Sequence, residues 1–175
     1  TTPVSDAEIH NLAANVSGQV LTPGSPAYDD ARTLWNAMID RRPGLIVACA
    51  RADDALHAVR FARKHSLLTA IHGAGHNIAG NAVCDGGIVI SFENMKAVEV
   101  DPDSGRVKVQ PGATLGDLDA ATQAHGLAVP TGINSTTGIA GLTLGGGFGW
   151  LSRKHGMTVD NLLAADVITA AGETV

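Results

Sequence analysis

The sequence predicts an α+β protein with one lobe at about residues 1–105 and a second lobe at about residues 106–175. Residues 45–71 have the pattern of a buried strand, a helix and a second buried strand, which is typical of parallel pairing. Residues 98–110 alternate between apolar and polar side chains around a turn at 102–105, which is typical of an antiparallel hairpin. Together these two patterns predict parallel strand pairing early in the chain and an antiparallel hairpin after it.

Capping residues and apolar spacing define the elements of the first lobe. Ser5-Asp6-Ala7-Glu8 forms a capping box for the first helix, and Asp53-Asp54 cap the third. Leu34, Trp35 and Met38 share the expected apolar face of the second helix. The expected helices are 5–14, 28–39 and 55–65, and the expected strands are 45–49, 68–71 and 88–90.

The predicted hairpin strands 98–101 and 106–110 lie on either side of the expected lobe boundary near residue 105. Thr114-Leu115-Gly116-Asp117 resembles a capping box and opens a helix that ends at Gly126. A short extended stretch follows at 127–129, and an apolar strand is expected at 162–170, turned by residues 171–173. Because the sequence stops within what reads as a hairpin, we expect it to be part of a longer protein.

Composition and charge exclude several classes of protein. Hydrophobic residues make up 45% of the 175 residues and charged residues 17%, which indicates a folded chain. The net charge of −5 argues against a nucleic-acid-binding or membrane-surface module. No apolar run reaches the ~20 residues of a membrane span, and no signal peptide is visible, so we expect a cytoplasmic protein without a membrane partner. Cys49 and Cys84 have no metal-binding or disulfide spacing and are expected to be packing groups.

The first candidate site is the loop His72-Gly73-Ala74-Gly75-His76-Asn77, directly after a predicted strand. Its small residues let successive backbone N–H groups face one anion, as in a phosphate-binding nest. It lacks the third glycine of the dinucleotide fingerprint and the lysine of a P-loop. A tight turn with two incidental histidines is the alternative. A metal set of His72, His76 and Asp85 is disfavoured because the glycines break the helix that would place both histidines on one face.

The second candidate site is the glycine-rich, almost uncharged tract at residues 136–149. So many glycines disfavour a regular helix or strand. The apolar residues Ile139, Leu142, Leu144 and Phe148 distinguish the tract from a polar linker, which is the alternative. The tract therefore predicts a wall against which a large flat ligand lies.

The remaining polar residues of note have simpler interpretations. Asp160-Asn161 precedes the last predicted strand, and a cap or turn is the commoner role of such a pair. Four other histidines are expected at the surface: His57, His65, His125 and His155.

In order along the chain, these motifs resemble the FAD-binding PCMH-type domain of the vanillyl-alcohol oxidase superfamily. The similarity is to its berberine-bridge-enzyme-like and 6-hydroxynicotine oxidase-like branch, and it runs from about Val20 to the end. The resemblance implies FAD between a small lobe with parallel strands and a larger, mostly antiparallel lobe flanked by helices. The motifs that carry it are 21–24, 42–43, Asp54, 58–62, 72–77, 85–87, 112–117, 138–149, 153–156 and 160–161.

The same resemblance implies a role for each part of the two sites. Loop 73–77 would hold the pyrophosphate by backbone N–H groups, and His76 would bond covalently to the 8α carbon of the flavin. Tract 136–149 would line the isoalloxazine ring and the ribityl chain. The implied cofactor-binding residues are His72, Gly73, Ala74, Gly75, His76, Asn77, Gly80, Thr136, Thr137, Gly138, Gly141, Leu144, Gly145, Gly146, Gly149, Asn161 and Val167.

Three residues depart from the family pattern. His72 stands where the family usually has Arg, which would make phosphate support pH-dependent, and Ala74 stands where Gly is usual. Asn134 stands where bicovalent members have Cys, which implies a single link through His76.

The implied activity is that of an oxidase. A hydride would pass from a C–H next to O or N of a small-molecule substrate to flavin N5, with O2 as reoxidant. The catalytic residues are expected in a C-terminal substrate domain outside this sequence, so residues 1–175 alone are expected to turn over no substrate. The alternatives are an FAD-dependent reductase of the UDP-N-acetylenolpyruvoylglucosamine reductase type, a non-catalytic scaffold that has lost its flavin, and a metal hydrolase.

Overall fold

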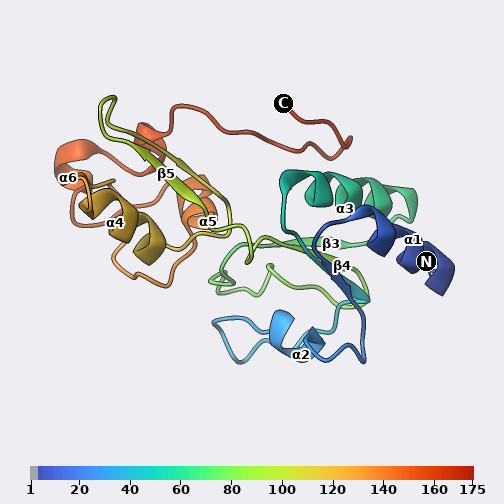
Figure 1. The fold of residues 1–175 in the computed structure, drawn as a ribbon. Coiled ribbons are helices and arrows are strands. Elements are labelled where there is room, and N and C mark those ends of the chain that lie inside the picture. The colour runs from blue at the N-terminus through green and yellow to red at the C-terminus, as the bar shows by residue number, and fades with distance from the viewer. Residues whose placement is uncertain (1–3) are drawn as a thin grey trace. The chain divides into compact units, whose positions relative to one another are not determined.

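The computed structural model describes residues 4–175, which divide into two compact units. Unit 1 runs to Asn94 and includes the final segment Asp166–Val175, and unit 2 is Met95–Ala165 (Figure 1). The boundary expected near residue 105 lies within unit 2, between the strands of its hairpin.

Unit 1 is built on a four-stranded sheet with the order β1-β2-β4-β3. Strands β2 (Leu45–Ala48) and β3 (Thr69–His72) both pair in parallel with β4 (Ile88–Ser91), which lies between them. The parallel pairing predicted from residues 45–71 is therefore confirmed. Strand β1 (Gln19–Leu21) runs antiparallel to β2 and was not predicted, because three residues are too few to show a period.

Helices cover both faces of this sheet. Helices α1 (Asp6–Asn15) and α3 (Ala52–Lys64) lie on one face, and α2 (Tyr28–Ala31) lies on the other (Figure 1). The small residues Ala55, Ala58 and Ala62 recur at helical spacing and are buried, so α3 approaches the sheet closely. The core that includes α2 is formed by Leu21, Tyr28, Ala31, Leu34, Ile46, Ala70, Ala82, Val83, Cys84 and Val89.

The second helix is much shorter than predicted and ends at Ala31 rather than Ile39. Arg32 forms ion pairs with Asp29 and Asp40, and the chain continues irregularly. Trp35 and Met38, expected on an apolar face, are instead 58% and 91% exposed. Tertiary contacts described below hold this segment against the loop after β3, and they override its helical pattern.

Asp54 helps to cap the third helix, as predicted, and it also has a structural role beyond the cap. Helix α3 begins at Ala52, and the buried Asp54 accepts backbone hydrogen bonds from Ser17 (2.7 Å), Gly18 (3.0 Å), Ala50 (2.8 Å) and Arg51 (3.3 Å). Burial alone would raise the pKa of Asp54, but these amides hold it below its usual value. One side chain thus joins the start of β1 to the start of α3.

Unit 2 contains the predicted hairpin and one predicted helix. Strands β5 (Val98–Asp101) and β6 (Arg106–Val109) pair antiparallel, and α4 (Leu115–Gln123) begins with a capping box between Thr114 and Asp117. Ala113, Leu115, Leu118 and Ile139 form the core, and Val98, Val107 and Val109 of the hairpin pack against it.

Two predictions for the later part of the chain were wrong. Tract 136–149 contains a short helix, α5 (Ile139–Leu144), because the buried Ile139 anchors it in the core of unit 2. The strand expected at 162–170 does not form, and only Ile168 makes a bridge, with Thr174. Unit 2 also contains α6 (Ser152–His155) and the 3₁₀ turn η1 (Val159–Asn161).

The final segment is attached to α3 by two arginines. Arg60 donates to the carbonyl of Gly172 through Nη2 (2.8 Å) and Nε (3.1 Å), and Arg63 Nη1 donates to the carbonyl of Ala171 (3.0 Å). Within the segment, Val167 and Val175 exchange backbone hydrogen bonds. These contacts explain why residues 166–175 belong to unit 1. Among the described residues, no helix is long and apolar enough to cross a membrane.

We expect Asp54→Ala to destabilise the protein by about 3 kcal/mol, because it leaves buried backbone amides without an acceptor. Asp53→Ala, one residue earlier and exposed, is the matched control and should have little effect. Urea unfolding at neutral pH measures both. Since the folded pKa of Asp54 is depressed, its contribution is present above the usual carboxyl value of 3.8 and is lost as pH falls below it. Equal midpoints for the two variants would contradict this role.

Candidate functional site

The loop after β3 begins at the carboxyl end of the parallel strands. His72, the last residue of β3, is aligned with Ser91, the last residue of β4, so both strands end at the same edge. In sheets with parallel strands, ligands bind at this edge, where the strands give way to loops. The predicted loop 72–77 therefore lies where such a sheet can bind a ligand.

His72 supports this loop from inside the protein. Its side chain is buried, and its Nδ1 has no hydrogen-bond partner among the described residues. Its Nε2 lies so near Gly75 that a Cβ added there would be 2.9 Å away. Burial lowers the pKa of His72, although the negative charge of Glu93 opposes this shift. The imidazole is thus a neutral packing surface for the loop at neutral pH.

Gly75 gives the loop its shape. Its φ of +70° lies in the left-handed region, and its carbonyl accepts a hydrogen bond from the Trp35 amide (3.2 Å). The backbone amides of Gly73, Ala74 and Gly75 donate to no acceptor within residues 4–175. Consecutive unused N–H groups at a left-handed glycine suit an anionic group such as a pyrophosphate. The predicted nest therefore fits such a ligand.

His76 presents its imidazole beside this nest. The ring stacks on the indole of Trp35, with ring centroids 4.7 Å apart and planes inclined by 15°. The His76 side chain is half-buried. The stack on Trp35 thus holds the imidazole beside the nest, and imidazole nitrogens are groups that can bond to a ligand.

The rest of the loop is closed by its own polar groups. The carbonyl of Asn77 accepts from the Gly80 amide (3.0 Å), and its Oδ1 accepts from the Asn81 amide (3.0 Å). Gly80 has a φ of +75°, and a Cβ there would be 2.8 Å from Ile39. Arg41 Nη1 donates to the carbonyls of Gly80 (2.9 Å) and Val83 (3.1 Å). Asn77 and Gly80 therefore have structural roles that account for their residue types.

In unit 2, several glycines of the second tract are required by packing within the unit. A Cβ on Gly146 would lie 2.6 Å from Met157, and one on Gly147 would overlap Thr158. A Cβ on Gly149 would overlap the Thr131 carbonyl. Backbone hydrogen bonds from Thr158 to Gly147 (2.8 Å) and from Val159 to Gly146 (2.9 Å) hold the same region.

Other residues of the tract face open space. A Cβ on Gly141 would meet nothing within 4 Å, and one on Gly145 would make only ordinary contacts. Leu144 and Phe148 are 84% and 76% exposed. Thr137, by contrast, uses its carbonyl to accept from the Leu115 amide (2.8 Å). Fewer residues of the tract are therefore open to a ligand than the sequence predicted.

Asn161 and Val167 have local partners. Asn161 Nδ2 donates to the carbonyls of His155 (3.1 Å) and Met157 (2.8 Å), and Asp160 Oδ2 accepts from the Met157 amide (2.8 Å). The pair thus makes the turn that was considered as the alternative. Val167 is in the final segment of unit 1, whereas Asn161 is in unit 2.

The sequence analysis missed the residues that brace the first loop from residues 34–41. Arg41 gave no signal of this role in the sequence, and Trp35 was assigned to a helix face. His65 was expected at the surface, but its side chain is only 14% exposed.

Within residues 4–175, no group of three His, Cys, Asp or Glu side chains could hold a metal ion. The metal-hydrolase alternative therefore has no supporting cluster.

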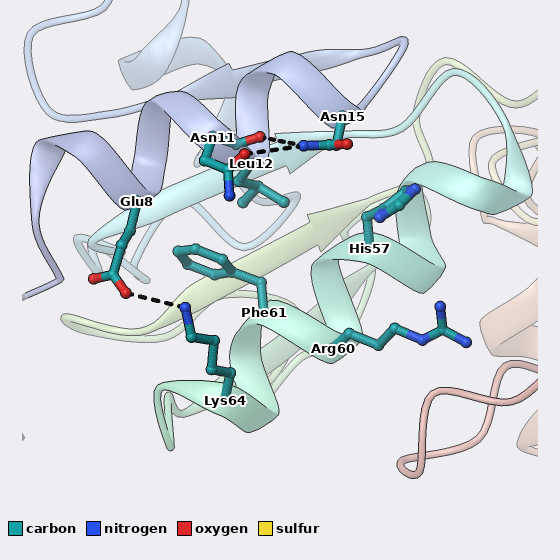
Figure 2. Close-up of a pocket in the computed structure, with 8 residues that line it drawn as sticks. All are labelled: Glu8, Asn11, Leu12, Asn15, His57, Arg60, Phe61 and Lys64. Carbon is teal, nitrogen blue, oxygen red and sulfur yellow. Dashed lines mark hydrogen bonds and ion pairs between the residues drawn. The ribbon is translucent and has the colours of Figure 1, made fainter.

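A groove of about 190 Å³ lies between α1 and α3 (Figure 2). Leu12 and Phe61 line it, and Lys64 at its rim donates to Glu8 (3.1 Å). None of its lining residues belongs to either glycine-rich segment. The groove is therefore separate from the candidate site.

We expect the stability of the protein to fall as pH drops below about 6.5, the usual value for histidine. The unfolded His72 takes up a proton there, whereas the buried ring does so only at lower pH. His72→Gln should flatten this dependence, and His125→Gln, at an exposed position, should not. Thermal unfolding of the three proteins between about pH 5 and pH 7.5 tests this. Each unit between the pKa of His72 in the folded and in the unfolded protein corresponds to about 1.4 kcal/mol of stability. An unchanged slope in His72→Gln would assign the effect to another group.

Comparison with known proteins identifies the group to which this chain is similar. The FAD binding domain family matches residues 43–175. The chain is 34% identical over 161 residues to (R)-6-hydroxynicotine oxidase of Paenarthrobacter nicotinovorans, covering 92% of this chain and 35% of that protein. The crystal structure of 6-hydroxy-D-nicotine oxidase from Arthrobacter nicotinovorans superposes with a TM-score of 0.90 at 33% identity, covering 100% of this chain and 36% of that one. A BBE-like protein of Physcomitrella patens gives a TM-score of 0.88 at 29% identity, covering 95% of this chain and 37% of that one.

The chain thus spans about 35% of the length of the oxidases that it matches. The similarity confirms both the α+β fold and the resemblance drawn from the ordered motifs. With more than half of its residues matched by the family and its full length superposing on an oxidase structure, the chain belongs to the FAD binding domain family.

Proposed function

We propose that this chain is the FAD-binding portion of a flavin-dependent oxidase and that His76 carries the flavin through a single covalent bond. The observation that carries the proposal is the loop after β3. It combines three unused backbone amides at Gly73–Gly75 with an imidazole directly beyond them. A nest for phosphates next to a ring nitrogen suits a dinucleotide that is also anchored at its flavin end.

In this proposal, each part of unit 1 has one task. The amides of Gly73, Ala74 and Gly75 donate to the pyrophosphate, and the left-handed φ of Gly75 keeps them pointing the same way. The neutral imidazole of His72 packs beneath them in place of the family's usual Arg. Bound FAD supplies the redox chemistry, which is hydride acceptance at N5 and reoxidation by dioxygen.

The covalent bond joins one imidazole nitrogen of His76 to the 8α carbon of the flavin. In the overall balance, the flavin methyl group, the imidazole N–H and O2 give a methylene-linked imidazole and H2O2. The carbon and the nitrogen each lose one hydrogen, and O2 accepts the two electrons. The imidazole substituent withdraws electron density from the ring, and the bond also prevents loss of the cofactor. Asn134, where a second link would need Cys, instead uses its Oδ1 to accept from the Thr136 amide (3.1 Å).

Unit 2 would contribute the surface for the isoalloxazine ring and ribityl chain. Gly141 is the residue best suited to this role, because it faces open space in a helix where alanine would otherwise be preferred. The glycines at 146, 147 and 149 are already explained by internal packing. Substrate-binding and catalytic residues would come from a substrate domain, since the chain covers 35% of the relative's length.

His76→Ala should abolish covalent flavin while preserving FAD binding, because the pyrophosphate contacts come from backbone amides. Flavin that stays with the protein after acid denaturation measures the bond. A tryptic digest of the wild type places it on the peptide 65–96, which contains His65, His72 and His76, so fragmentation must distinguish the three. Flavin on His72, or a yellow wild-type protein that releases all its FAD in acid, would contradict the assignment. A colourless protein that cannot be loaded with FAD would support the scaffold alternative instead.

Gly141→Ala tests the surface in unit 2. The added methyl group meets no protein atom, so the variant should be as stable as the wild type or up to about 1 kcal/mol more stable. If the flavin lies against Gly141, the same methyl group should weaken FAD binding by roughly tenfold or more. Equilibrium dialysis in the His76→Ala background measures affinity without bond formation. Unchanged affinity would remove Gly141 from the flavin surface.

A further inference from the structure

The stack of Trp35 on His76 is not explained by core packing. The indole is 58% exposed, so burial of its apolar surface does not account for its position. The two rings are nevertheless nearly parallel, with planes inclined by 15° and centroids 4.7 Å apart. The centroid distance lies within the range of interacting aromatic pairs. The exposed indole thus makes a specific contact with the one imidazole on which the proposed flavin bond depends.

Trp35 is itself held by the loop that contains His76. Its backbone N–H donates to the Gly75 carbonyl (3.2 Å), one residue before His76. The neighbouring Asn36 Nδ2 donates to the Ile78 carbonyl (3.0 Å), two residues after it. Leu34, on the other side of Trp35, is buried in the core of unit 1. The backbone that carries the indole is therefore held to the loop on both sides of His76, which places the indole face against the imidazole.

We propose that Trp35 is a positioning residue that orients the imidazole of His76 for bonding to the flavin, an inference that rests on the proposed function of His76. Rotation about the Cβ–Cγ bond of a histidine is intrinsically broad, and an aromatic face stacked on the ring narrows it. Bond formation requires one nitrogen to face the 8α carbon at close range. A small misplacement of a reacting atom lowers such rates strongly, by up to about 100-fold for 1 Å.

The test follows the rate of covalent flavin incorporation in the full-length protein. Apoprotein from riboflavin-limited cells is mixed with FAD, and acid-stable flavin fluorescence is recorded over time. Trp35→Ala should slow incorporation by roughly tenfold or more, whereas Trp35→Phe, which keeps an aromatic face, should stay within about threefold of the wild type. Trp150→Ala removes the other tryptophan of this chain, which is 87% exposed, and should leave the rate unchanged.

A second measurement separates orientation of the ring from general support of the loop. In the His76→Ala background, where no bond can form, adding Trp35→Ala should change the FAD dissociation constant by less than about twofold. A loss of affinity as large as the loss of rate would mean that Trp35 merely supports the loop, and would overturn the proposal. So would wild-type rates in Trp35→Ala, or a Trp35→Phe variant as slow as Trp35→Ala.

Failure of the underlying function would be seen separately, in the wild type. If the wild-type protein binds FAD but forms no acid-stable adduct, the covalent role of His76 is wrong and the role of Trp35 is wrong with it. If the wild type forms the adduct and Trp35→Ala forms it equally fast, only the role of Trp35 is wrong. If Trp35→Ala does not fold, as judged by its thermal transition, Trp35→Phe and Trp35→Tyr decide by the same rate measurement.

Discussion

The geometry of the proposed site depends on the close packing at Gly75. The carbonyl of this residue is held by the Trp35 amide, and the imidazole of His72 fills the space where a side chain would be. These contacts keep the backbone in a left-handed conformation and leave the preceding amides unused. The arrangement is therefore prepared before any ligand binds, and a prepared nest avoids the cost of ordering the loop on binding.

The two glycine-rich segments use glycine for different reasons. In unit 1, Gly75 is required because His72 and the left-handed φ exclude a side chain. In unit 2, the glycines at 146, 147 and 149 make room for Met157, Thr158 and the Thr131 carbonyl, which are parts of the same unit. Glycine density alone therefore overestimates the surface that a flavin could contact. Glycines whose small size is not required by packing within the unit, above all Gly141, are the better candidates for contact with a flavin.

Local patterns predicted much of the fold, whereas tertiary contacts decided the rest. The buried strands, the hairpin and the Thr114 capping box follow from spacing and residue type, and all three are present. The helix predicted over 28–39 failed because Trp35 and Asn36 bond to a loop some 40 residues later, which no local pattern contains. The histidines of loop 72–77 were found from their glycine neighbours, but neither the burial of His72 nor the partner of His76 could be inferred from the sequence.

Unit 2 is inserted within unit 1, because Arg60 and Arg63 of α3 hold the backbone of Gly172 and Ala171. During synthesis, the first unit therefore cannot gain its last contacts until the whole of the second has left the ribosome. Both ends of the inserted unit are then joined to unit 1, so the inserted unit is held by two links rather than by one.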